Sequence, residues 1–291
     1  MTIQAPAPNP QGTAIHDQGY RHYAGQRAPH GRAWWVIARS HVVSASQSRG
    51  FRILLLAAWA PFVVRAAQIY VSSTNLPVPE FIATSPETFR DFLAQQRLFV
   101  FLVTIGQAGL IADDRRTNAL QLYLSKPLTR VEYILGKLAP PLAYVLFVTL
   151  VPGLLLLLLQ IIFAGSLTFL RANLFLLPAI TLFSVIQALL SAFAILALSS
   201  LTKSRRFVSI MYAGVIFFTA AMYQALRGIT NSRTWAVISP GEMLDVIANA
   251  IFRGRGEPAV PVYVAILVVF AIIGVAVLIL ERRIRGVEVV A

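Results

Sequence analysis

The chain has 291 residues, of which 57% are hydrophobic and 13% are charged. Soluble domains are about 45–50% apolar and about 25% charged, so this composition excludes an ordinary soluble fold and a disordered chain. The sequence contains no Cys, which also excludes a disulfide-stabilised secreted scaffold.

The region before the first long apolar run falls into two parts. Residues 1–30 are rich in Pro, Ala, Gln, Gly and His, and this composition predicts a flexible cytoplasmic tail. Residues 31–50 place apolar side chains on one helical stripe, which predicts an interfacial amphipathic helix with Trp34, Trp35 and Arg39 as membrane-surface anchors. A helix packed against the membrane bundle is the alternative for this segment.

Residues 51–291 are predicted to form a six-span domain. A spanning helix needs about 20 apolar residues. The second apolar run is short, and Ser85 followed by Pro86 indicates that its helix begins earlier, near residue 86. The six predicted spans are about 53–71, 95–112, 138–164, 174–200, 207–226 and 260–280.

The positive charges set the predicted orientation. Seventeen of the 25 Lys and Arg residues lie before the first span, in the 113–137 and 201–206 loops, or after the last span. Because positively charged loops stay on the cytoplasmic side, both termini are predicted to be cytoplasmic. The net charge of +13 thus comes mainly from basic residues on the cytoplasmic side, where they face anionic lipid. No nucleic-acid partner is therefore expected.

The 113–137 loop is polar but patterned. Residues 117–125 can form about two helical turns with Leu120, Tyr123 and Leu124 on one side, and Pro127 ends that helix. A solvated turn has no need of apolar side chains at helical spacing. We therefore expect this short helix to dock on another protein, and a merely solvated turn is the alternative.

Two sequence signals predict further helix starts. Thr129 and Glu132 form a capping box that opens a helix running into the third span. Ser239, Pro240 and Glu242 form a second start signal, which predicts an outer amphipathic helix before the last span, ended by Gly254.

The chain offers little that could catalyse a reaction or drive ion-coupled transport. No acidic residue lies in the middle of a predicted span, and all four His residues lie in the first 41 residues. Ion-coupled carriers commonly use such groups as relays. Asp113 and Asp114 are followed at once by Arg115 and Arg116, which favours local ion pairing over a metal site. We expect no catalytic, cofactor or metal residues in this chain.

A few polar residues within or beside the spans are candidates for a transport pathway. The glutamines fit either this role or ordinary hydrogen bonds between helices. Arg65 lies near the outer end of the first span, so it can reach the outer surface or contact a substrate. The candidate pathway residues are Arg65, Gln107, Gln160 and Gln187.

The segment from Ile111 to Lys137 resembles the first cytoplasmic loop of ABC type-2 transporter permeases. Members of that family typically show an acidic-Arg start, a short helix, a Leu-Ser-x-Pro-Leu-[Ser/Thr]-Arg stretch and a Gly-Lys pair before the third span. Here these features are Asp114-Arg115, residues 117–124, residues 124–130 and Gly136-Lys137. One departure is Thr117-Asn118, where many members have a small Gly.

The resemblance implies that the loop forms a coupling helix on a separate ATPase subunit. The implied docking residues are Asp113, Asp114, Arg115, Arg116, Thr117, Leu120, Tyr123, Leu124, Ser125 and Pro127. It also implies two ATPase copies, a second or homologous permease copy, and ATP and Mg on the ATPase rather than on this chain. The implied location is the bacterial plasma (inner) membrane.

Together these observations predict an all-α polytopic membrane protein without enzymatic activity. Its expected function is that of the permease subunit of an ABC exporter. A stand-alone secondary carrier is the second hypothesis, and a membrane-embedded enzyme is the third.

Overall fold

The computed structural model describes residues 33–73, 84–119, 129–165, 168–254 and 256–285. These residues all belong to one compact unit, 31–291, and the predicted tail, 1–30, lies outside the described residues. The described part is all-helical, and five of its helices are long and apolar enough to cross a membrane.

The first spanning segment is Arg49–Ser73, which consists of helices α2 (Arg49–Ala57) and α3 (Ala60–Ser73). Pro61 has no N–H to donate to the carbonyl four residues earlier, and the helix is interrupted just before it, at Ala58 and Trp59. Helix α1 (Ala33–Gln47) precedes this segment and packs mainly against α8 (Arg130–Ala164), burying Ile37 and Ala38. The helix predicted for 31–50 is therefore present and packed on the bundle.

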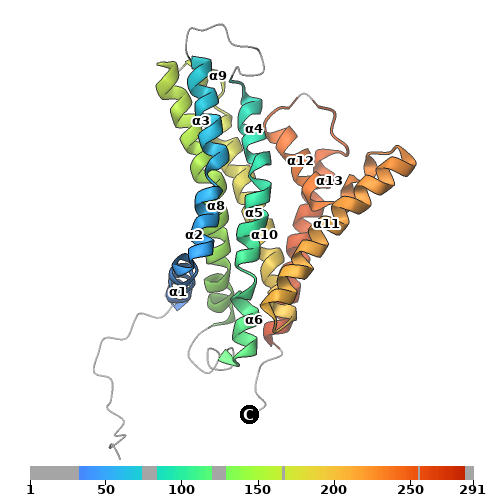
Figure 1. Cartoon of the computed structure of the whole chain (residues 1–291). Coiled ribbons are helices and arrows are strands. Elements are labelled where there is room, and N and C mark those ends of the chain that lie inside the picture. The colour runs from blue at the N-terminus through green and yellow to red at the C-terminus, as the bar shows by residue number, and fades with distance from the viewer. Residues whose placement is uncertain (1–32, 74–83, 120–128, 166–167, 255, 286–291) are drawn as a thin grey trace, which may run out of the picture. The chain divides into compact units, whose positions relative to one another are not determined.

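The predicted second span is a column of three short helices rather than one long helix (Figure 1). These are α4 (Pro86–Gln95), α5 (Arg97–Gly106) and α6 (Gly109–Arg116). As expected, Ser85 precedes the first of them, and its N–H donates to Thr88 Oγ1 at 3.2 Å. None of the three is long enough alone to be counted as a span, so the sixth crossing stays a prediction.

The remaining long helices are α8, α10 (Leu176–Leu201), α11 (Arg205–Thr230) and α13 (Val262–Arg285). Helix α8 continues through Pro140, Pro141 and Pro152, which membrane helices tolerate where neighbouring helices satisfy the released carbonyls. Helices α8 and α10 pack extensively against each other, and α10 also packs against α13. The short α9 (Thr168–Ala172) lies between α8 and α10 in the chain.

The helix predicted at Ser239 is α12 (Pro240–Ile251), which follows the short 3-10 helix η1 (Thr234–Ile238). Its start is as predicted, because Ser239 Oγ accepts a hydrogen bond from the Glu242 N–H at 3.5 Å. Its apolar side is covered by α13, α11, α10 and α4, and it buries Met243 and Ile247. Helix α12 is thus an integral part of the bundle.

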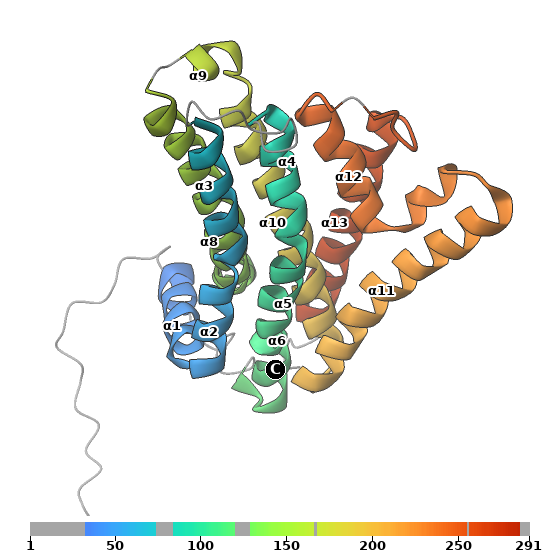
Figure 2. The same ribbon diagram turned by 45° about the horizontal axis from the view of Figure 1, so that its top comes forward.

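Figures 1 and 2 show α11 diverging from the bundle toward Thr230, while its first turns lie close to α6 and α10. At this same end α6 ends, α8 begins and α10 ends. We call it the loop end, because the predicted docking segment connects α6 to α8 there. The opposite end carries the start of α4 and helix α12.

Candidate functional site

A buried ion pair joins α6 to α8 at the loop end. Lys137 Nζ lies 2.5 Å from Asp114 Oδ2, and the Lys137 side chain is completely buried. The Tyr133 hydroxyl donates a hydrogen bond to the same carboxylate oxygen at 2.8 Å. Tyr133 and Lys137 are four residues apart in α8, so both side chains point to one face of the helix.

His41 adds helix α1 to this group. Its Nε2 lies 2.8 Å from Lys137 Nζ, and the ammonium group is the donor because a lysine cannot accept. Burial, followed by the nearby positive charge of Lys137, lowers the pKa of His41 to about 4. The imidazole is therefore neutral at pH 7. We call His41, Asp114, Tyr133 and Lys137 the Lys137 cluster.

Gly136 explains how α1 and α8 come close enough to form this cluster. A Cβ atom at this position would lie 2.9 Å from Ile37 Cβ and 3.0 Å from the Trp34 carbonyl oxygen. Any side chain here would push α1 away from α8. The Gly136-Lys137 pair thus combines a close helix contact with a buried charge next to it.

A second set of contacts ties α6 to the end of α10. Ser199 Oγ accepts hydrogen bonds from the N–H groups of Ile111 at 3.1 Å and Ala112 at 2.9 Å, and donates to the Ala108 carbonyl at 2.7 Å. These backbone groups belong to the interruption between α5 and α6, where the normal helix bonds are missing. The Arg115 guanidinium also donates to the Ser200 carbonyl.

A polar cavity of about 220 Å³ lies beside the cluster, between α1, α2, α6 and the start of α11. Asp113, Asp114, His41 and Arg205 are among its lining residues, and Arg205 also donates to the Gly106 carbonyl at 2.8 Å. The described residues contain no group of three or more His, Asp or Glu side chains that could hold a metal ion. The contacts at the loop end join four helices: α1, α6, α8 and α10.

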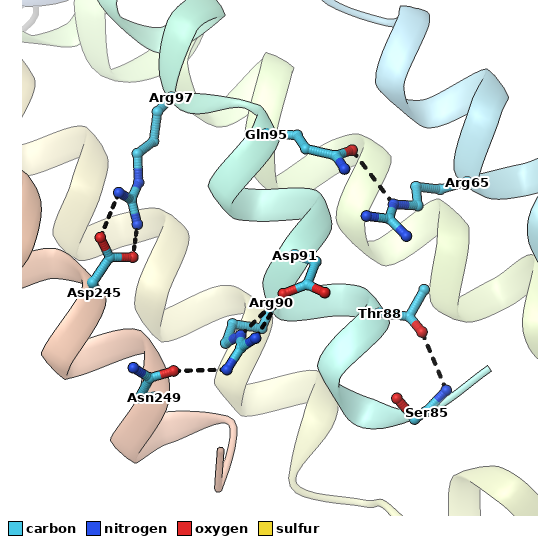
Figure 3. A network of polar contacts seen from close by, with 9 residues as sticks. All are labelled: Arg65, Ser85, Thr88, Arg90, Asp91, Gln95, Arg97, Asp245 and Asn249. Atoms are coloured by element: carbon cyan, nitrogen blue, oxygen red, sulfur yellow. Dashed lines mark hydrogen bonds and ion pairs between the residues drawn. The ribbon is translucent and has the colours of Figure 1, made fainter. Parts of the chain in front are cut away.

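Figure 3 shows a second polar network, near the start of α5. Arg97 at the start of α5 forms a two-bond ion pair with Asp245 of α12, one bond being 2.6 Å. Arg90 lies seven residues before Arg97, and Asn249 lies one helical turn after Asp245. Arg90 Nη1 donates to Asn249 Oδ1 of α12 at 2.8 Å, and the Arg90 guanidinium also pairs with Asp91. This network fixes α12 to the α4–α5 column.

The structure describes only the first half of the predicted docking residues. Asp113 pairs with Arg116 at 3.5 Å, as expected for two acids that are followed directly by two arginines. Helix α6 ends at Arg116, Thr117 caps it, and Asn118 has a φ of 55°, a left-handed conformation that Asn tolerates. The docking helix was expected to begin at Thr117, but the chain becomes helical again only at Ala119. The other members lie outside the described residues: Leu120, Tyr123, Leu124, Ser125 and Pro127.

The candidate pathway residues lie in different places. Gln107 lines the polar cavity at the loop end, whereas Gln187 lines a separate apolar cavity. Arg65 donates to Gln68 at 2.7 Å. It also donates to Gln95 at 3.4 Å, a bond shown in Figure 3. Gln160 is buried in α8. A pathway through all four residues remains a prediction.

The interfacial anchor residues differ in exposure. Trp35 is 57% exposed and Arg39 is exposed, as a membrane-surface position requires, whereas Trp34 is half-buried. These exposures fit an α1 that packs on α8 with one face and leaves the other face free.

Sequence reasoning did not identify His41, Tyr133 or Lys137 as members of one site. Lys137 carried a signal, because it is the last charged residue before the long apolar run of α8. His41 carried none, since it is 96 residues from its partner in the chain.

The class of protein follows from these observations. Five helices of the described residues can cross a membrane by length and apolarity. This is the architecture of a multi-pass helical membrane protein. In comparison with known proteins, the chain matches no family model and no curated sequence.

Proposed function

We propose that this chain is the transmembrane subunit of an ABC transporter, in the export direction, with ATP hydrolysed by a separate ATPase subunit. The proposal starts from the 111–137 segment and its resemblance to the coupling loop of ABC type-2 permeases. The observation that carries it furthest is the Asp114–Lys137 ion pair, because it joins the two helices that flank the predicted docking segment.

The contacts around this pair support a mechanical role for the segment. Asp114 precedes the segment and Lys137 follows it, so a displacement of the segment is passed to both α6 and α8. From α6 it reaches α10 through Ser199, and from α8 it reaches α1 through His41. A docked ATPase whose contacts differ between nucleotide states can shift such a joint between two arrangements.

The proposed working unit contains two copies of a permease and two of the ATPase. ATP and Mg bind the ATPase, and this chain supplies the path through the membrane. Both chain termini and the segment 117–128 lie on the cytoplasmic side in this proposal.

A paired substitution tests the docking role. Leu120→Asp combined with Tyr123→Asp places two charges on the apolar side of the docking helix, so we expect the ATPase no longer to co-purify with the tagged chain. The readouts are the amount of ATPase recovered, identified by mass spectrometry, and the ATP hydrolysis of the eluate.

The matched control changes two exposed apolar residues at the loop end but outside the segment. Val36 is 61% exposed and Val131 is 64% exposed, so Val36→Asp with Val131→Asp adds the same charge. We expect the control to retain the ATPase. Equal recovery of the ATPase with both double variants, both inserted in the membrane, would reject docking at this segment.

A further inference from the structure

An apolar cavity of about 350 Å³, separate from the polar cavity, lies between α5, α10, α11, α12 and α13. Its volume falls within the range of about 300–1,000 Å³ that small-molecule sites occupy. Its walls are mostly aliphatic and include Leu190, Ala194, Ile216, Leu244, Ile272 and Val275.

The cavity opens between α11 and α13. Both helices line it, yet α11 packs against α10, α6, η1 and α12 and makes at most slight contact with α13. Val215 of α11 is 47% exposed and Val275 of α13 is 56% exposed, and both belong to the lining, so they mark the opening. Figure 2 shows α11 diverging from the bundle on this side.

The position of the opening determines where a ligand comes from. Val215 and Val275 lie near the middle of two helices that are each long enough to cross the bilayer. The opening is therefore placed in the hydrocarbon layer, and a ligand enters from the membrane rather than from water.

The inner wall carries an unsatisfied polar group. Gln187 is 2% exposed, and its Oε1 has no hydrogen-bond partner among the described residues. Ser191 and Tyr212 also line the cavity. A buried acceptor without a donor is unfavourable, and a ligand that supplies the donor removes this penalty.

The charges around the cavity favour an uncharged ligand. Arg97 is the charged residue of the lining, and Asp245 meets its charge through two hydrogen bonds from the Nη atoms. The buried Arg97 Nε has no hydrogen-bond partner among the described residues. An ionised ligand group would enter the hydrocarbon layer without an opposite charge to meet, which is costly.

We propose that this cavity is a binding site for a neutral lipophilic molecule that bears a hydroxyl or amide donor, with the donor bonded to Gln187 Oε1. The apolar body of the ligand fills the aliphatic part and enters between α11 and α13. This site belongs to the chain itself and does not depend on whether an ATPase docks at the loop end.

Photolabelling of the full chain in phosphatidylcholine nanodiscs tests the proposal. The probes are hexadecanol and hexadecane, each with a diazirine near the end of its chain, and unlabelled hexadecanol is the competitor. We expect the alcohol probe to label cavity residues of α10, α11 and α13, and excess competitor to displace it. The hexadecane probe should bind more weakly.

Two variants test separately the hydrogen bond to Gln187 and the space in the cavity. Gln187→Leu should weaken binding of the alcohol about five- to tenfold and leave the hexadecane probe unchanged, because one buried hydrogen bond is lost. Ala194→Phe should fill the cavity and abolish displaceable labelling by both probes. Ala221→Phe on the exposed side of α11 is the matched control and should bind as the parent chain does.

Two outcomes would overturn the proposal. One is labelling that is spread over the exposed helix faces and that the competitor does not displace. Bulk lipid gives this result, and so does a cavity that a second copy of the chain covers. The other is unchanged affinity for the alcohol in Gln187→Leu, with the thermal unfolding of that variant equal to that of the parent chain.

Discussion

Lys137 is fully buried in an apolar helix, so its charge is tolerated only because Asp114 and His41 meet it. Burying an ion pair costs desolvation energy on both partners, and good geometry with extra hydrogen bonds is needed to offset this cost. Tyr133 supplies one such bond to Asp114. The Lys137 cluster therefore contributes more to the fixed geometry of α1, α6 and α8 than to net stability.

Lys137→Met should be strongly destabilising. The variant keeps the volume of the side chain but leaves the Asp114 carboxylate buried without its cation, a loss of about 3–5 kcal/mol in unfolding free energy. The measurement is thermal or denaturant unfolding in detergent.

The control is Arg116→Met, which removes the partner of Asp113 at the surface. The Arg116 side chain is 68% exposed, and exposed pairs contribute only about 0–1 kcal/mol. If the two variants were equally stable, the Asp114–Lys137 pair would not be buried as described.

His41 gives the fold a dependence on pH. Its pKa is lowered to about 4, first by burial and then by the charge of Lys137, whereas an unfolded chain has an ordinary His near 6.5. Between these values the unfolded chain binds a proton that the folded chain does not. The stability that neutral His41 contributes is therefore complete above pH 6.5 and is lost as the pH falls toward 4.

His41→Gln should flatten this part of the pH profile. Gln can still accept a hydrogen bond from Lys137 but does not titrate, so the variant should lose less stability between pH 6.5 and pH 4.5 than the parent chain does. Melting temperatures measured across this range provide the test, and parallel profiles would show that His41 is not the titrating group.

At the scale of helices, two interruptions face each other. Helices α2 and α3 are separated at Ala58, and helices α4 and α5 are separated at Gln96. The buried Gln96 side chain donates from Nε2 to the Ala58 carbonyl at 3.0 Å. One interruption thus supplies the donor that a carbonyl at the other interruption needs.

Gln96→Met should remove this bond while keeping the length of the side chain. It leaves the Ala58 carbonyl without this donor, and we expect a loss of about 1–3 kcal/mol in unfolding free energy. Gln95→Met is the matched control, since Gln95 is the exposed neighbour and should change little. Unfolding curves of the two variants, recorded side by side, decide the point, because equal stability would contradict the link between the two interruptions.

The parts of the fold that local sequence determines were predictable. Thr129 and Glu132 exchange their expected hydrogen bonds, with the Thr129 N–H donating to Glu132 Oε2 at 2.9 Å. The start of α12 at Ser239 is likewise set by residues within one turn. Such caps depend on neighbours in the chain and need no tertiary information.

The interruptions and the Lys137 cluster were not predictable in the same way. The separation of α5 from α6 is stabilised by Ser199, which is 91 residues from Ala108 in the chain. Lys137 meets Asp114 only because the folded bundle brings the end of α6 to the first turns of α8. A single sequence does not specify which distant polar groups meet, so these features follow only from the packed structure.

At the scale of the whole molecule, the account depends on which side of the membrane the loop end faces. The chain has no Cys, so single cysteines can be introduced without background. Thr117 and Thr234 are both exposed and lie after α6 and after α11. Three spanning helices, α8, α10 and α11, lie between these positions, so they are on opposite sides of the membrane. With six spans and cytoplasmic termini, Thr117 is inside and Thr234 is outside.

Thr234→Cys should react with a membrane-impermeant maleimide in intact cells, and Thr117→Cys should react only after permeabilisation. The positive charges near the loop end keep it inside. Labelling of Thr117→Cys in intact cells, with Thr234→Cys protected until permeabilisation, would contradict the predicted orientation, and with it the access of an ATPase to the segment 117–125.

The most direct test of the central claim, that this chain obtains its motion from a separate ATPase, is the mass of the intact complex isolated from its own host. We predict a particle that contains two permease subunits, including this chain of 31.9 kDa, and two ATPase subunits, and that falls apart when Leu120 and Tyr123 are changed to Asp. A chain that is isolated alone or only with itself, and that transports a substrate without ATP, would contradict the account.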